Sequence, residues 1–166
     1  MSRQPKLVLR ESCVHDVSAD WAPGRFLEMG AGTGYMTRLF LDRGFEGAAS
    51  DLGENSRAMM RANLAYVGER MRVIDDEREL APASFDYLFA FEVLEHIEDD
   101  HGALRSWTRF LRPGGRVLIS VPAHMRKFGR SDEITGHVRR YEKDELRALL
   151  AGAGFEQITI LNYGFP

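Results

Sequence analysis

The chain has 166 residues, enough for one domain with a buried core, and 44% of them are hydrophobic. Its 22 basic and 25 acidic side chains nearly cancel, so the total charge indicates neither bulk nucleic-acid binding nor attraction to a membrane surface. The single cysteine, Cys13, excludes an internal disulfide and fits a reducing compartment, so we expect a cytoplasmic protein. The sequence has neither the roughly 20-residue apolar run of a membrane span nor the pattern of a signal peptide.

Apolar strand-like runs alternate with helix-like patterns along residues 1–166, and no linker or repeat divides them. This alternation predicts a single α/β domain with a doubly wound, mostly parallel sheet and helices on both faces. The predicted strands are residues 25–29, 46–50, 72–75, 86–91, 116–121 and 156–162.

Three of the connecting segments carry apolar residues at helical spacing. The expected buried faces are Met59, Ala62 and Tyr66 in the first, Leu104, Trp107 and Leu111 in the second, and Leu146, Leu149 and Leu150 in the third. We expect the second helix to stop at Pro113-Gly114, and the third to be ended by Gly152 and Gly154.

Three glycines at alternate positions follow the first predicted strand, in the run Glu28-Met29-Gly30-Ala31-Gly32-Thr33-Gly34. Glycine permits a tight turn and a close approach of the backbone to a ligand. The helix-like run 35–43 that follows offers free N–H groups to an anionic group. A dinucleotide fingerprint needs a glycine where Tyr35 stands, which argues against a nicotinamide-dependent reductase. Glu28, at the end of the strand, can instead receive a cationic amine.

The pattern Glu-x-Gly-x-Gly-x-Gly resembles the nucleoside-binding loop of class I S-adenosylmethionine-dependent methyltransferases. The resemblance continues through Asp51, Asp76, residues 85–96 and residues 111–122, and so covers nearly the whole chain. It implies a Rossmann-like fold that binds S-adenosylmethionine and releases S-adenosylhomocysteine.

The family's sheet has a seventh, antiparallel strand, for which no residues remain after the sixth predicted strand. We therefore expect this strand to be missing. The favoured interpretation is truncation at the C-terminus. The alternative is that a second copy covers the exposed sheet edge in a homodimer.

The resemblance also implies roles for individual residues. Glu28 would pair with the cofactor's ammonium and Asp51 with the two ribose hydroxyls. Asp76 would accept from the adenine amine, with Asp75 as an alternative, while the N–H of Glu77 reaches a ring nitrogen. The full set of predicted cofactor-binding residues is Glu28, Gly30, Ala31, Gly32, Gly34, Asp51, Leu52, Asp76, Glu77, Phe91 and Val93, in which Leu52, Phe91 and Val93 supply apolar walls.

Methyl transfer from a sulfonium requires alignment and, where the nucleophile holds a proton, a base. His96 follows the fourth predicted strand, and His137 lies on the loop before the last helix, so both are expected on the ligand side of the sheet. An imidazole titrates at roughly pH 6.5, which suits proton removal from a phenol or similar hydroxyl. We predict that both histidines are catalytic, with His137 the better candidate for general base.

A second interpretation of the same histidines involves a metal. Glu92, Glu95 and His96 fall at i, i+3 and i+4, so a helical turn would bring them to one face, where His137 can meet them. Two carboxylates and two imidazoles suit a divalent metal. Related Glu-x-x-Glu-His stretches occur in ubiquinone-pathway O-methyltransferases and small-RNA 2′-O-methyltransferases, where they are tied to a metal. The sequence alone favours the simpler interpretation that Glu95 and His96 cap the turn, and it assigns no metal ligands.

The acceptor is less well defined by the sequence. Residues 125–143 contain six Arg or Lys and three acids, so Arg139 and Arg140 either hold an acidic substrate or belong to a solvated face. DNA amine methyltransferases usually carry Asn/Asp-Pro-Pro-Tyr/Phe after the fourth strand, where this chain has Phe91-Glu92-Val93-Leu94, so DNA is not an expected partner. The sequence predicts methyl transfer to a small molecule, with oxygen favoured over nitrogen. The alternative is a catalytically silent cofactor-binding or dimerising domain.

Overall fold

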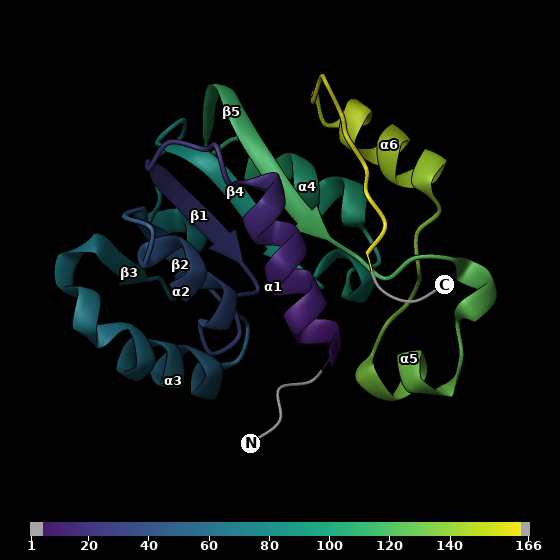
Figure 1. The fold of residues 1–166 in the computed structure, drawn as a ribbon, viewed down its shortest axis with the longest axis horizontal. Helices are drawn as coiled ribbons and strands as arrows, with labels where there is room; N and C mark the ends of the chain where they lie inside the picture. Colours follow the sequence, from purple (N-terminus) through teal and green to yellow (C-terminus); the bar gives the residue numbers. More distant parts are fainter. Residues whose placement is uncertain (1–4, 164–166) are drawn as a thin grey trace.

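The computed structural model describes residues 5–163 (Figure 1). Its five strands form one parallel sheet in the order β3-β2-β1-β4-β5. The strands are β1 (Arg25–Met29), β2 (Glu46–Ser50), β3 (Met71–Val73), β4 (Phe85–Phe91) and β5 (Leu111–Ser120). The predicted Rossmann-like, doubly wound α/β fold is confirmed.

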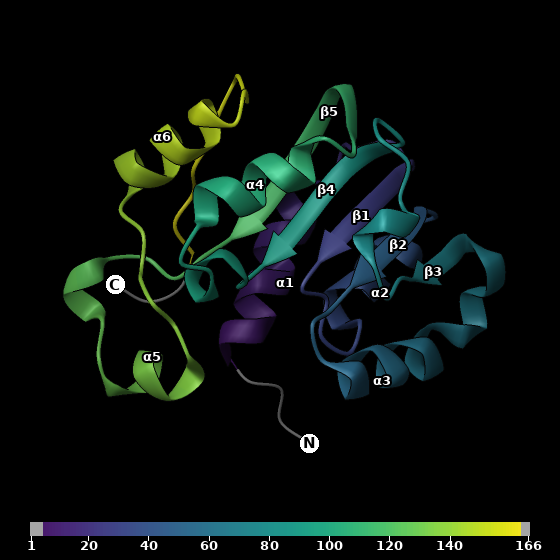
Figure 2. The ribbon, with the colours of Figure 1, turned by 180° about the vertical axis from the view of Figure 1, so that it is seen from behind.

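Helices cover both faces of this sheet (Figures 1 and 2). One face carries α1 (Pro5–Val17), α2 (Tyr35–Leu41) and α3 (Glu54–Leu64), and the other carries α4 (Asp100–Thr108) and α6 (Lys143–Gly152). The short helix α5 (Arg130–Thr135) lies beyond the carboxyl ends of the strands. The 3-10 turns are η1 (Ala65–Arg70), η2 (Glu77–Glu79), η3 (Leu94–His96) and η4 (Met125–Lys127).

The central strands β1 and β4 carry nearly continuous apolar residues and are buried on both faces of the sheet. In β4, Leu88 and Ala90 join the core cluster under α4 and α6, while Tyr87, Phe89 and Phe91 join the cluster under α1, α2 and α3. Successive side chains of a strand point to opposite faces. One strand therefore supplies both halves of the core.

The ring of Phe89 is the centre of the aromatic cluster on the α2 side. It is fully buried, and its centroid lies 4.1 Å from that of Phe40 and 5.5 Å from that of Phe26. Stacked contacts to Phe91 and Tyr87 extend the cluster along β4. This packing fixes α2, and with it the loop that precedes α2, against the middle of the sheet.

Two of the helix predictions are corrected by the structure. Met59 and Tyr66 are 55% and 57% exposed, because α3 is rotated so that Met60 and Leu64 are buried instead. The helix α4 ends at Thr108 rather than at Pro113-Gly114. That dipeptide lies within β5, whose pairing with β4 has a register irregularity that accommodates it.

The predicted sixth strand is wrong, since residues 156–163 form no strand in the structure. Ile158 and Ile160 pack against the core cluster under α4 and α6, which explains the strand-like alternation in the sequence. The backbone carbonyl of Ile158 accepts a hydrogen bond from the Arg147 side chain at 2.7 Å. The segment is thus held by side chains rather than by a ladder of backbone hydrogen bonds.

Within residues 5–163, no helix has both the length and the apolar character required to cross a bilayer.

Replacement of Phe89 by Ala should lower the free energy of unfolding by about 3–5 kcal/mol, because it opens a cavity among the surrounding rings. Phe89→Leu keeps most of the volume and should cost about 1–2 kcal/mol. Urea unfolding followed by circular dichroism measures both values. A loss below about 1 kcal/mol for Phe89→Ala would show that this cluster does not anchor the sheet.

Candidate active site

The turn between β1 and α2 contains three glycines with positive φ, at +68° for Gly30, +56° for Gly32 and +87° for Gly34. A Cβ on Gly30 would stand 2.5 Å from a methyl carbon of Val93, and one on Gly34 would stand 2.9 Å from a methyl carbon of Leu64. A Cβ on Gly32 would meet no protein atom within 4 Å. At Gly30 and Gly34, glycine is therefore needed both for the positive φ and for the close contact with Val93 or Leu64. Gly32 borders open space instead.

Asp51, just beyond β2, is joined to this turn. Its carboxylate accepts hydrogen bonds from the backbone N–H of Gly32 at 2.8 Å and from that of Gly53 at 2.9 Å. The N–H of Ala31 donates to the carbonyl of Ser50 at 2.9 Å. These contacts place Asp51 beside the glycine whose missing side chain leaves space for a ligand.

Glu28 lies at the penultimate position of β1 and is 2% exposed. Its carboxylate accepts a hydrogen bond from the Thr37 hydroxyl at 2.7 Å. Burial raises the pKa of Glu28 to about 7, against a smaller lowering by the Thr37 hydrogen bond. A buried carboxyl with this pKa is suited to pair with a cation that arrives with a ligand.

The two acids that follow β3 have different partners. Asp75 pairs with Arg57 and Arg61 of α3, with N···O distances of 2.8 Å each. Asp76 caps η2, and its hydrogen bonds with Arg78 lower its pKa to about 2. Asp75 is thus committed to α3, whereas Asp76 and the adjacent Glu77 form the turn at the carboxyl end of the sheet.

The three predicted apolar walls have different environments. Leu52 is fully exposed next to Asp51, and Val93 is partly buried against Gly30. Phe91 is only 7% exposed, and its ring lies parallel to that of Phe40 in the core. Val93 therefore borders the glycine turn and Leu52 is open to a ligand, whereas Phe91 belongs to the core.

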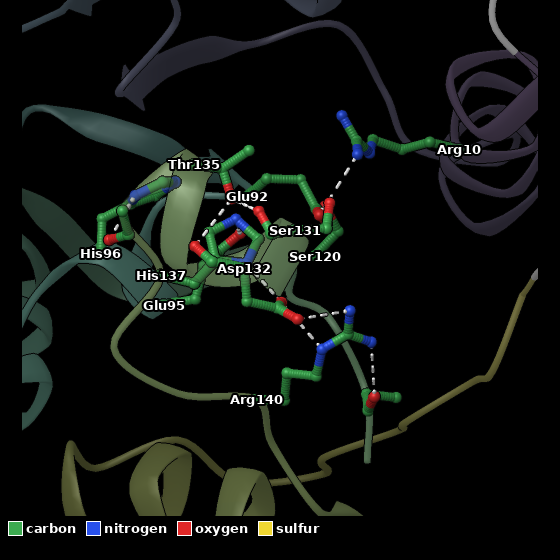
Figure 3. A network of polar contacts seen from close by, with 12 residues as sticks. Arg10, Glu92, Glu95, His96, Ser120, Ser131, Asp132, Thr135, His137 and Arg140 are labelled. Carbon is green, nitrogen blue, oxygen red and sulfur yellow. Dashed lines mark hydrogen bonds and ion pairs between the residues drawn. The ribbon is translucent and has the colours of Figure 1, made fainter. Parts of the chain in front are cut away.

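The two candidate catalytic histidines meet beyond the end of β4 (Figure 3). The ring centroids of His96 and His137 are 4.7 Å apart, at an interplanar angle of 82°. The Nδ1 of His137 is 2.8 Å from a carboxylate oxygen of Asp132, and the Nδ1 of His96 is 3.1 Å from the carbonyl oxygen of Gly136. The expectation that the returning loop brings His137 to His96 is confirmed.

Glu95 completes this group from the buried side. Its side chain is 0% exposed, and neither carboxylate oxygen has a hydrogen-bond partner among the described residues. One of these oxygens lies 3.8 Å from the Nε2 of His137. Burial, and then the nearby charge of Glu92, raise the pKa of Glu95 to about 8.

Glu92 does not share a helical face with Glu95 and His96, so that expectation is wrong. Its φ is +57°, and the helical turn η3 begins only at Leu94. Its side chain accepts a hydrogen bond from the Ser120 hydroxyl at 3.0 Å and lies 3.4 Å from a guanidinium nitrogen of Arg10 in α1 (Figure 3). Glu92 thus links the end of β4 to β5 and α1.

Two buried acids that the sequence analysis did not single out organise the loop between β5 and α6. Asp132 accepts from the Arg140 side chain at 2.8 and 3.0 Å, and Asp100 accepts from Arg139 at 2.9 Å and from the Tyr141 hydroxyl at 2.8 Å. Arg139 and Arg140 therefore have internal partners, which removes the basis for assigning them to an acidic substrate. The five-residue spacing between Asp132 and His137 is the one sequence feature that could have indicated their pairing, but it is not a recognised motif.

Comparison with known proteins agrees with this geometry. Residues 8–160 match the family model described as "Methyltransferase domain". A "Probable S-adenosylmethionine-dependent methyltransferase" of Mycobacterium tuberculosis is 33% identical over 136 residues, which cover 81% of this chain and 49% of the relative. A similarly described protein of Mycolicibacterium smegmatis is 34% identical and covers 89% of this chain and 58% of the relative. The chain spans about half the length of the curated relatives it matches.

Solved structures of methyltransferases share the fold of this chain. The 1,6-didemethyltoxoflavin-N1-methyltransferase of Burkholderia thailandensis, with bound 1,6-didemethyltoxoflavin and S-adenosylhomocysteine, is 29% identical with a TM-score of 0.69, over 86% of this chain and 64% of that one. Phosphoethanolamine N-methyltransferase 2 of Haemonchus contortus, in complex with S-adenosylmethionine, shares the fold with a TM-score of 0.73 at 23% identity. The match covers 89% of this chain and 37% of that one.

The sheet order and the glycine turn define a Rossmann-like nucleoside-binding domain. The chain belongs to the class I S-adenosylmethionine-dependent methyltransferase family. S-adenosylmethionine is the cofactor of this family, and the open space at Gly32 and the buried carboxyl of Glu28 fit it.

Gly32→Val should abolish binding of S-adenosylhomocysteine, because its side chain would fill the space beside Asp51 that the cofactor needs. The control is Gly114→Val, which has a φ of +77° and equally open surroundings at the opposite end of the sheet. Both variants carry a backbone cost of at least about 1–2 kcal/mol, which urea unfolding measures. Calorimetric titration should show normal cofactor binding by Gly114→Val, and equal loss in both variants would contradict our placement of the cofactor.

Cofactor affinity should fall about tenfold from pH 8 to pH 6, because the ammonium needs an ionised Glu28 and this carboxyl has a pKa of about 7 in the free protein. Glu28→Gln should bind more weakly and with little pH dependence in this range. Titration calorimetry with S-adenosylhomocysteine at each pH measures the trend. A wild-type profile as flat as that of Glu28→Gln would exclude the pairing.

Proposed function

We propose that this chain transfers a methyl group from S-adenosylmethionine to an oxygen atom of a small-molecule acceptor. The observation that carries the proposal is the open glycine turn at Gly32, which follows β1 at the same edge of the sheet where the cluster of His96, His137 and Glu95 follows the parallel strand β4. One part of this edge suits a nucleoside with an amino acid moiety, and the other suits a group that must lose a proton.

On the cofactor side, the described contacts support the roles that the resemblance implies. Asp51 holds the backbone of Gly32 and is thereby placed for the ribose hydroxyls. Glu28 would pair with the ammonium, and Asp76 with Glu77 would receive the adenine between the exposed side chain of Leu52 and the turn η2. When bound, S-adenosylmethionine supplies the electrophilic methyl group.

On the acceptor side, His137 is the group best placed to take up a proton in a metal-free site. Asp132 is ion-paired with Arg140, so its carboxylate accepts and the Nδ1 of His137 donates. The Nε2 of His137 then carries the lone pair, and the side chain is 16% exposed. This arrangement orients an imidazole as a general base for a hydroxyl, which must lose its proton as the new bond to the methyl carbon forms.

Two similar proteins bear on the acceptor atom. The ubiquinone biosynthesis O-methyltransferase of Pseudomonas aeruginosa, 29% identical over 64% of this chain and 47% of its own length, supports oxygen and a small molecule. The N1-methyltransferase of Burkholderia thailandensis makes nitrogen the alternative. A domain that binds the cofactor without turnover is the other candidate, because the chain matches only part of its relatives.

We also propose that residues 1–166 form one domain and that the protein acts in the cytoplasm. We expect no DNA partner. The edge strand β5 is the surface on which a second copy would form a homodimer, since the described residues provide no further strand beside it.

His137→Ala should reduce turnover by roughly 10²-fold or more, with the affinity for S-adenosylhomocysteine nearly unchanged, because it removes the base and leaves the glycine turn intact. His101→Ala, which removes an exposed imidazole of α4, is the matched control and should retain activity. The assay is release of S-adenosylhomocysteine in the presence of phenols, catechols, hydroxy acids and amines.

Two outcomes would contradict the proposal. Cofactor binding without turnover on any of these acceptors would favour the silent binding domain. Turnover on amines alone would exclude oxygen as the preferred acceptor atom.

A further inference from the structure

We propose that Glu95, His96 and His137 bind a divalent transition-metal ion. The sequence alone favours a metal-free turn at this place, and the geometry of the side chains changes that expectation. Ion binding follows from the protein's own residues, whereas the ion's chemical role rests on the proposed function.

The three side chains already converge on one place where they could share an ion. Each offers one ligand atom, and the three atoms lie within 4.8 Å of one another. They come from two segments far apart in the sequence, the turn η3 after β4 and the loop after α5 (Figure 3). The fold therefore assembles a small, convergent set of donors.

Both imidazoles have a hydrogen-bond partner at Nδ1 of the kind that metal-bound histidines have. The Nδ1 of His137 donates to the carboxylate of Asp132 at 2.8 Å, and the Nδ1 of His96 donates to the carbonyl of Gly136 at 3.1 Å. Since a carbonyl and an ion-paired carboxylate only accept, each Nδ1 carries the hydrogen and each Nε2 carries a lone pair. Metal-bound histidines almost always donate their other ring N–H to a carboxylate or a backbone carbonyl in this way.

The buried carboxylate of Glu95 indicates independently that a ligand binds here. It is fully buried, and within residues 5–163 neither of its oxygens has a hydrogen-bond partner. Buried polar groups in folded proteins are nearly always satisfied. Protonation would not satisfy it, because its hydroxyl and its carbonyl oxygen would still lack partners. A bound cation would satisfy it, and the Nε2 of His137 stands 3.8 Å away on the other side of the space that the cation would fill.

The donor set indicates the class of metal. Two imidazole nitrogens and one carboxylate oxygen favour borderline ions such as Mn²⁺, Fe²⁺, Co²⁺ or Zn²⁺ over Mg²⁺ and Ca²⁺, which prefer oxygen ligands. Three protein ligands leave further coordination positions open. Glu92 lies nearby but is engaged by Ser120 and Arg10, so it adds negative charge rather than a ligand.

A bound ion would change how the acceptor loses its proton. The acceptor hydroxyl would bind at an open coordination position, where the ion lowers its pKa. The O–H bond breaks and the proton passes to water. The oxygen then forms its bond to the methyl carbon as the carbon–sulfur bond breaks, and S-adenosylhomocysteine leaves with the electron pair on sulfur. In this form of the site the Nε2 of His137 is a ligand and no longer the base.

The test is direct ion binding by the full chain after removal of metal with EDTA. Mn²⁺ binding followed by electron paramagnetic resonance, and Co²⁺ binding followed by visible absorption, should each show one site. His96→Ala, His137→Ala and the isosteric Glu95→Gln should each weaken binding at least tenfold, and Asp132→Asn should weaken it roughly 10–100-fold through the orientation of His137. His96 is exposed, so its variant should fold even if Glu95→Gln does not.

The control is His124→Ala, which breaks another histidine–carboxylate pair, with Glu142 at 3.1 Å, away from the cluster. It should leave ion binding unchanged. No binding by folded wild-type protein, or binding that survives His96→Ala and His137→Ala together, would overturn the proposal. Turnover that EDTA leaves unchanged would overturn the ion's catalytic role while leaving the proposed function intact. One-site binding without any turnover would instead refute the proposed function and support the metal site.

Discussion

Parallel pairing of β1 with β2 and β4 is the constraint on which the rest of the molecule depends. Glu28 is paired with Ala49 on one side and with Phe89 on the other, so the three strands end at the same edge. The glycine turn, Asp51 and the turn that carries Glu95 and His96 leave from these three ends. The strand pairing thus brings residues that are far apart in the sequence to one edge, where contacts such as the hydrogen bond from the N–H of Gly32 to Asp51 join them.

The acceptor side of this edge depends on buried charge rather than on the sheet. Asp100 holds Arg139 and Tyr141 against α4, and Asp132 holds Arg140 and the ring of His137. Removing one partner of such a buried pair is strongly destabilising, because the other charge is left unpaired. The loop between β5 and α6 is therefore a fixed wall of the site, and its arginines are structural.

The sequence was a good guide wherever the signal is local. The glycine turn needs a defined backbone conformation, and the predicted bounds of β1, β2 and β4 agree with the structure within one residue at each end, because strand patterning and glycine spacing are properties of short segments. It failed where the outcome depends on tertiary packing. Met60 and Leu64 are the buried residues of α3 because they pack against Gly34, which has no side chain. The alternating apolar residues of 156–162 pack their side chains against the core, but their backbone does not pair with a strand. Pairings such as Asp132 with Arg140 have no pattern to reveal them.

At Glu92 the backbone and the side chain make opposite demands on the choice of residue. Its φ of +57° is a conformation that glycine adopts freely and other residues adopt at a cost. Its side chain nevertheless joins β4 to Ser120 of β5 and to Arg10 of α1. Glycine at this position would relax the backbone, but it would also remove the ion pair with Arg10 that ties the N-terminal helix to the rim of the site. The strain in the backbone at residue 92 is therefore set against the links that its carboxylate makes to β5 and α1.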